Sequence, residues 1–218
     1  MGLSIAAAVG LYGVSFGALA VTAGLSVAQA CALSLLMFTG GSQFAFIGVV
    51  SGGGSLPAAF AASSLLGVRN AVYGVQISAL LRPRRRLRPV IAHFTIDEST
   101  ATALAQDDRA EQRRGFWTAG LGVYALWNLF TLVGALAGEH LGDPKAWGLD
   151  GAAVAAFLGL LWPRLRARDP IVIAVAAAFA TIVTVPFVPP GIPIVIAAAV
   201  SGTIAVLHHR RPDVREAR

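Results

Sequence analysis

The sequence contains few charged residues and a single cysteine. Charged side chains make up 13% of the 218 residues and hydrophobic side chains 56%, whereas a soluble domain usually carries about 25% charged residues. Cys31 is the one cysteine, so neither a disulfide within the chain nor a cysteine metal site can form. Several stretches near 18 residues or longer carry no charge, which is typical of transmembrane helices. With a mean hydropathy of +0.70, we expect an all-α, polytopic membrane protein.

Enzyme motifs are also missing. There is no GxSxG nucleophile elbow, no HExxH zinc motif and no Walker loop, and the glycine-rich stretch 51–55 lacks the lysine of a P-loop. The four histidines form no ligand spacing: His93, His140, His208 and His209. We therefore predict that the protein is not an enzyme and has no catalytic residues, metal or cofactor. An intramembrane hydrolase that uses Asp97 is the one enzymatic alternative.

The basic residues are concentrated in short clusters. Of the 17 Lys and Arg residues, 15 fall within 82–88, 109–114, 164–168 and 210–218. These clusters bracket apolar runs, as the positive-inside rule expects of cytoplasmic loops. No nucleic-acid-binding motif accompanies the net charge of +6. We interpret the clusters as orientation signals and lipid-headgroup contacts, and predict no nucleic-acid partner.

The apolar pattern predicts about seven transmembrane segments. They cover 3–24, 27–50, 56–80, 116–138, 151–163, 171–188 and 192–207. Residues 89–107 are only partly apolar and lie between two basic clusters, so this segment is either re-entrant or a crossing that places one cluster against the rule. With seven spans and a re-entrant 89–107, the N-terminus is expected outside and the C-terminus in the cytoplasm.

Glycine marks the first and fourth of these spans. The Gly13-x-x-x-Gly17 spacing allows another helix to approach closely. The pentamers at 10–14 and 120–124 are faintly alike, and three spans precede the middle of the chain, so an inverted repeat of the kind found in transporters is one hypothesis.

Thr39-Gly40-Gly41-Ser42-Gln43 interrupts the predicted second span at its centre. Two glycines and three hydrogen-bonding side chains indicate an unwound or kinked helix. Non-helical backbone at this depth is tolerated where protein or a water-filled cavity satisfies it, and transporters use broken helices to hold substrates near the midplane. The other reading is a glycine-rich packing kink.

Arg69 is the one basic residue predicted to lie in the membrane core. It is 11 residues from Leu80, about 16 Å along a helix, and an intramembrane arginine costs roughly 2.5 kcal/mol or more. It therefore needs a partner, which is either Asp97 or Glu98 or the carboxylate of a substrate. Alternatively, Asp97-Glu98 is the solvated start of a cytoplasmic helix with Thr95 as N-cap.

The motifs resemble the AzlC family, and the resemblance extends from residue 2 to about 205. They are Gly-Val-Ser-Phe-Gly at 13–17, Phe-Thr-Gly-Gly-Ser-Gln-Phe at 38–44, Val-Arg-Asn-Ala-Val-Tyr-Gly at 68–74, Thr-Ile-Asp-Glu-Ser at 95–99 and Gly-Leu-Asp at 148–150. Four positions depart from the usual family pattern: Gly67, Asn70, Ile96 and Gly151. The resemblance implies one transporter domain over 1–218 in a bacterial inner membrane, a small AzlD-like membrane subunit as partner, and proton-driven export of branched-chain amino acids.

Two functional hypotheses follow. In the first, the chain is an exporter whose substrate-binding residues are Gly40, Gly41, Ser42, Gln43, Arg69, Asn70 and Tyr73. Asp97 and Glu98 would then serve in proton coupling or as an ion pair with Arg69, and an apolar wall of Phe16, Phe44 and Phe46 would accept the aliphatic side chain. In the second, the chain is a non-transporting scaffold or sensor subunit whose polar residues serve only helix packing.

Overall fold

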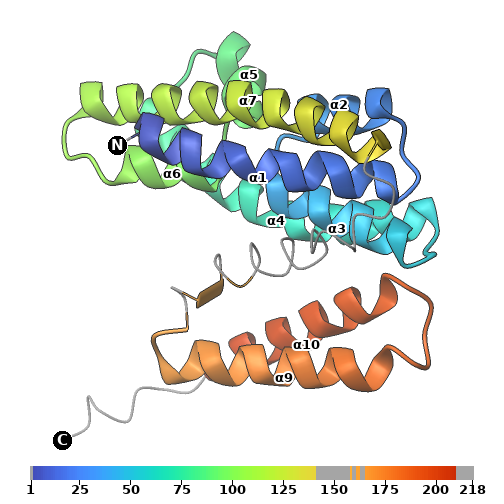
Figure 1. Ribbon diagram of the computed structural model, residues 1–218. Helices are drawn as coiled ribbons and strands as arrows, with labels where there is room; N and C mark the ends of the chain where they lie inside the picture. Colours follow the sequence, from blue (N-terminus) through green and yellow to red (C-terminus); the bar gives the residue numbers. More distant parts are fainter. Residues whose placement is uncertain (1, 141–157, 159–160, 163–164, 210–218) are drawn as a thin grey trace, which may run out of the picture.

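The computed structural model describes residues 2–140, 158, 161–162 and 165–209, and every regular element within these ranges is a helix (Figure 1). The elements are α1 (Gly2–Thr22), α2 (Val27–Leu36), α3 (Gly40–Ser51), α4 (Leu56–Leu81), the 3-10 turn η1 (Arg85–Leu87), α5 (Arg88–His93), α6 (Asp97–Leu104), α7 (Arg109–His140), α9 (Arg168–Thr184) and α10 (Ile192–His209). The predicted all-α class is confirmed for this part of the chain. The predicted span 151–163 lies largely outside the described residues.

Helices α1 and α7 form the closest pair in the bundle because glycines on both helices remove the side chains between them. Cβ atoms built on Gly17 and Gly134 would overlap the carbonyl oxygens of Thr131 and Val14. Gly10, seven residues before Gly17, faces Leu126, five residues before Thr131, so α1 and α7 run in the same direction. This is the packing by small residues that the glycine spacing of 3–24 predicts.

The predicted second span does not cross the bundle but turns back on itself. Helix α2 starts at a capping box in which Ser26 and Gln29 bond each other's backbone N–H, and it ends at Leu36. After three residues, α3 runs back toward the end at which α2 begins, where Val50 lines a groove with Ala23 and Gly24. At the turn, the Gln43 amide donates to the Met37 carbonyl at 2.8 Å. The two halves have 10 and 12 residues, about 15 and 18 Å, so each reaches about half of a 30 Å hydrocarbon core.

Residues 88–104 form a second, shorter helical hairpin, which enters from the opposite end. Ile91 of α5 and Ala103 of α6 pack with Leu81 and Phe116, near the end of α4 and the start of α7. The turn at 94–96 lies deeper in the bundle, where the Phe94 ring is 6.1 Å from that of Phe38, in the turn of the first hairpin. The segment 89–107 therefore folds back on itself, as the re-entrant reading predicts, and the tips of the two hairpins meet.

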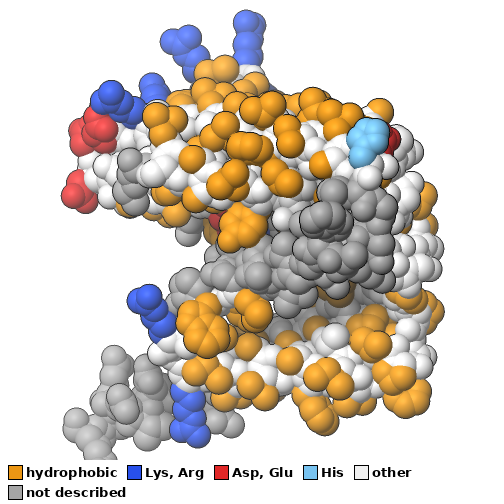
Figure 2. Space-filling model, viewed as in Figure 1, with side chains coloured by type: hydrophobic (Ala, Val, Ile, Leu, Met, Phe, Trp, Pro, Cys, Tyr) orange, Lys and Arg blue, Asp and Glu red, His pale blue; other side chains and the backbone are white. Residues whose placement is uncertain are grey.

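The basic residues of the described part of the chain lie toward one end of the molecule, along the left and the upper part of the view in Figure 2. The end of α4 lies beside the start of α7, where Arg113 donates to the Leu81 carbonyl at 3.5 Å. The start of α10 lies at the other end, with Ile194 packed on Val49 and Ala59. Helices α1, α4 and α7 run along the long direction of the molecule, and the shorter antiparallel pair α9 and α10 lies along the same direction (Figure 1).

The parallel course of α1 and α7 corrects the predicted topology. With 27–50 counted as a crossing, 3–24 and 116–138 were expected to run in opposite directions, and an inverted repeat was one hypothesis. The expected direction is wrong, because α2 and α3 return to the end from which they enter, and the parallel pair α1 and α7 does not support the inverted repeat. The N-terminus therefore lies at the same end as the basic clusters. Among the described helices, α1 and α7 are long and apolar enough to cross a membrane by length and composition, so seven spans are not confirmed.

Candidate functional site

A cavity of about 270 Å³ lies where the two hairpin tips meet the middle of α4. Its walls come from α1, the two hairpins, α4 and α7. The lining residues are Val9, Tyr12, Phe38, Thr39, Gly40, Gly41, Phe44, Arg69, Ile96, Asp97, Glu98, Val123 and Trp127. An apolar cavity with a few convergent charged groups is the usual form of a small-molecule site.

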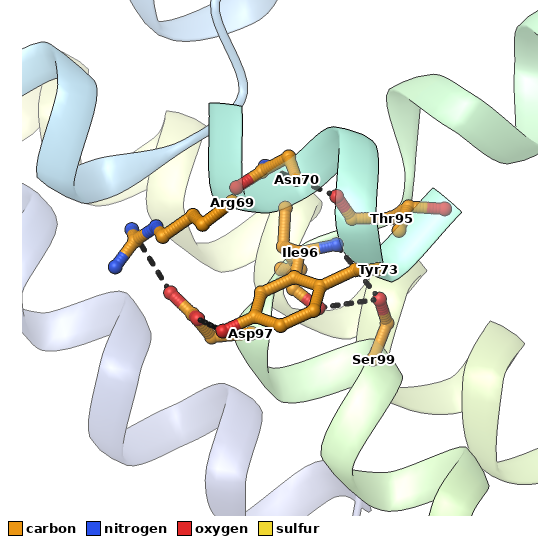
Figure 3. A network of polar contacts seen from close by, with 7 residues as sticks. All are labelled: Arg69, Asn70, Tyr73, Thr95, Ile96, Asp97 and Ser99. Carbon is orange, nitrogen blue, oxygen red and sulfur yellow. Dashed lines mark hydrogen bonds and ion pairs between the residues drawn. The ribbon is translucent and has the colours of Figure 1, made fainter. Parts of the chain in front are cut away.

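Arg69 and Asp97 form an ion pair at this cavity. The Arg69 Nη2 and the Asp97 Oδ2 atoms are 2.9 Å apart, and both side chains are largely buried, at 26% and 19% exposure. Tyr73, one helical turn after Arg69, donates its hydroxyl to Asp97 Oδ1 at 2.8 Å (Figure 3). Among the partners considered from the sequence, Asp97 is the one paired in this structure. A charged pair with an added hydrogen bond offsets part of the cost of removing both charges from water.

The turn before Asp97 is fixed by hydrogen bonds to its backbone. The Asn70 amide donates to the Thr95 carbonyl at 3.2 Å, which ties the hairpin tip to α4. Ser99 accepts from the Ile96 N–H at 3.0 Å (Figure 3), and it donates to the Phe94 carbonyl at 2.7 Å. Thr95 is not the N-cap, because Ile96 holds that position and the Thr95 hydroxyl donates to the Ile91 carbonyl.

Gln43 stabilises the tip of the first hairpin, the turn between α2 and α3. Its side chain is completely buried; its amide nitrogen donates to the Met37 carbonyl, and its amide oxygen accepts the Trp127 indole N–H at 2.8 Å. The same amide lies 3.4 Å from the Ser34 carbonyl. The nitrogen and the oxygen of the Gln43 amide are thus both hydrogen-bonded within the protein. Gln43 is not among the residues that line the cavity. It positions Trp127, a residue that no pattern in the sequence marks as part of a site.

The N-terminus of α3 opens onto the cavity without a side-chain cap. Thr39 is the N-cap residue and makes no capping hydrogen bond. The Thr39 hydroxyl and the Arg69 Nε are buried and have no hydrogen-bond partner among the described residues. Gly41 lets the guanidinium approach this helix end, since a Cβ there would lie 2.7 Å from Arg69 Nη2. Free N–H groups, a hydroxyl and a guanidinium together suit an anionic group such as a carboxylate.

The apolar part of the cavity differs in detail from the predicted wall. Phe44 lines it, but Phe16 lies behind, completely buried, with its ring 5.7 Å from that of Phe44 and 6.2 Å from that of Trp127. Phe46 instead lines a separate groove near the ends of α1 and α3. Trp127 and Phe38 take the place of Phe16 and Phe46.

The structure therefore divides the predicted binding residues into two groups. Gly40, Gly41 and Arg69 line the cavity together with Asp97 and Glu98. The other four predicted binding residues do not line the cavity: Ser42, Gln43, Asn70 and Tyr73. Because Asp97 and Glu98 face the cavity, they are not the solvated start of a cytoplasmic helix. The site thus presents one cation, two carboxyl groups and the hydroxyls of Thr39 and Tyr12 in a mainly apolar pocket, the pattern that a zwitterion with an aliphatic side chain would complement.

The family model described as AzlC protein matches residues 4–141, which include both hairpins and the whole cavity. An uncharacterized membrane protein of Archaeoglobus fulgidus is 35% identical over 158 residues, covering 71% of this chain and 68% of that protein. An uncharacterized membrane protein of Helicobacter pylori is 27% identical over 158 residues, covering 72% and 69%. No solved structure matches.

Proposed function

Since the chain belongs to the AzlC family of membrane proteins, we propose that it transports branched-chain amino acids out of the cell. The observation that carries this proposal is the cavity at the two hairpin tips, with Arg69 paired to Asp97 on one side and aromatic and aliphatic walls on the other. Broken helices that meet near the midplane are where transporters bind their substrates. We further propose that a small AzlD-like membrane subunit completes the exporter.

We assign the ends of the amino acid by charge. The carboxylate takes the position between Arg69 and the uncapped start of α3, where the Thr39 hydroxyl supplies a further donor. The aliphatic side chain contacts Phe44, Trp127 and Val123, and the fit of this wall favours leucine, isoleucine and valine. Asp97 and Glu98 provide the carboxyl groups for proton coupling.

The orientation follows from the basic end of the molecule. We place this end in the cytoplasm of a bacterial cell, because cytoplasmic loops carry the excess of arginine and lysine. The N-terminus then also lies in the cytoplasm, and the first hairpin enters from outside. The two hairpins thus approach the cavity from opposite sides of the membrane, as alternating access to one central site requires.

Efflux by Arg69 variants tests the proposal. In cells preloaded with labelled leucine, we expect Arg69→Ala to abolish efflux while the protein still inserts, and Arg69→Lys to retain a fraction because it keeps the charge without the planar fork. Arg86→Ala, in the exposed basic cluster, is the matched control and should export normally. Wild-type efflux from Arg69→Ala would refute the assignment. Absence of flux from the native protein, with the partner subunit still bound, would instead favour a non-transporting subunit.

A further inference from the structure

We propose that Glu98 is the group at which a proton and the ammonium group of the substrate compete, so that each amino acid bound releases about one proton. The inference rests on the proposed transport of amino acids and deepens it, since it gives Asp97 and Glu98 different tasks. Asp97 positions Arg69, and Glu98 couples substrate to protons.

The two carboxyl groups are adjacent in sequence but have different surroundings. Both oxygens of Asp97 are engaged, one by Arg69 and the other by Tyr73. The Glu98 side chain lines the cavity, and among the described residues its carboxyl group makes no hydrogen bond or ion pair. Its backbone carbonyl accepts from Thr102 in the ordinary manner of a helix. Glu98 is therefore the carboxyl group left to meet a ligand.

Few other titratable groups face Glu98. Helix α4 contributes Arg69 and Tyr73, α6 contributes Asp97, and α1 contributes Tyr12. The lining residues from α3 and α7 are glycine, Phe44, Val123 and Trp127, none of which titrates. A substrate ammonium group in this cavity thus finds one carboxylate whose oxygens are not already bonded.

An unpaired carboxylate in an apolar cavity is costly, so a proton or a cation must neutralise it. In the empty cavity a proton fills this role. When the amino acid enters, the O–H bond of Glu98 breaks, the proton passes to water, and the ammonium group, which keeps its own three protons, pairs with the carboxylate. Return of a proton from the other side of the membrane reverses the exchange. Competition of this kind gives antiport, which is the coupling an exporter driven by inward proton flow requires.

The test is proton release on leucine binding by the purified full chain, measured with a pH indicator in weak buffer and with labelled leucine. We expect about one proton per leucine bound, and an apparent affinity that falls about tenfold for each pH unit below the titration range of Glu98. Glu98→Gln should bind leucine more weakly and release no proton. If Glu98→Gln binds too weakly to measure, Glu98→Asp should restore both binding and release. Glu111→Gln, an exposed carboxyl change on α7, is the matched control.

Asp97→Asn separates the two carboxyl groups. We expect it to weaken leucine binding and still release a proton, because Glu98 is intact. Proton release that persists in Glu98→Gln, or that is lost in Asp97→Asn while leucine still binds, would overturn the inference. Leucine binding by the native protein without proton release would overturn it and leave the proposed function standing. No binding of leucine at any pH, either by the chain alone or by its complex with the small membrane subunit, would refute the proposed function itself.

Discussion

Gly41→Ala should displace Arg69 without changing any charged group. The new Cβ would lie 2.7 Å from Arg69 Nη2, so the guanidinium must move by about 0.7 Å to reach an ordinary contact of 3.4 Å. The pair with Asp97 is 2.9 Å long, and hydrogen bonds to charged groups contribute about 1.5–3 kcal/mol. Loss of roughly half of such an interaction with the substrate carboxylate is about 0.75–1.5 kcal/mol, or roughly four- to thirteenfold in Kd.

Leucine binding to the purified full chain measures this effect. Gly48→Ala is the matched control, because it lies in the same helix and a Cβ there meets no atom within 4 Å. Gly48→Ala should leave leucine affinity unchanged and stabilise the helix by up to about 1 kcal/mol. Equal leucine affinities for Gly41→Ala and the native protein would refute the placement of the substrate carboxylate beside Arg69.

Three further predictions concern the scaffold. Gln43→Leu leaves the buried indole N–H of Trp127 without its acceptor, at about 1–3 kcal/mol, so the midpoint of thermal unfolding in detergent should fall; an unchanged midpoint would contradict the role of Gln43. Gly134→Leu forces α1 and α7 apart and should lower the yield of folded protein, whereas Gly74→Leu, in open space on α4, should not. In a Cys31→Ser background, a membrane-impermeant maleimide should label Leu3→Cys from the same side as Arg86→Cys, and labelling from opposite sides would contradict the parallel course of α1 and α7.

Local signals in the sequence predicted the helix starts well. Ser26 caps α2 as expected, and Pro57 lies in the first turn of α4. The need of a buried arginine for a partner also pointed to the region that contains Asp97. These features depend on a few neighbouring residues or on one large energetic cost, and both can be recognised in a single sequence.

The reversal of 27–50 could not be predicted in the same way. Its 24 residues suit a full crossing, and glycine permits a kink and a turn equally well. What selects the turn is contact with distant residues: Gln43 bonds Trp127, 84 positions away in the chain, and Phe38 packs on the ring of Tyr124 at 4.9 Å. The end of the molecule at which α1 begins depends on this turn. Because 27–50 was counted as a crossing, the N-terminus was predicted at the end opposite to the basic clusters.

The roles of the residues that support the cavity walls also depend on contacts that a sequence does not show. Gln43, Asn70 and Tyr73 carry the polar groups that a substrate site would need, and their side chains could equally serve the protein. Only their burial and partners distinguish the two uses. Trp127 gave no signal, since a tryptophan within an apolar span is ordinarily read as packing.

A structure of the full chain with bound leucine tests the central claim most directly. The account predicts leucine at the hairpin tips, with its carboxylate within hydrogen-bond distance of Arg69 and the start of α3, and its side chain against Phe44 and Trp127. Leucine bound elsewhere, with the Arg69–Asp97 cavity empty, would contradict it.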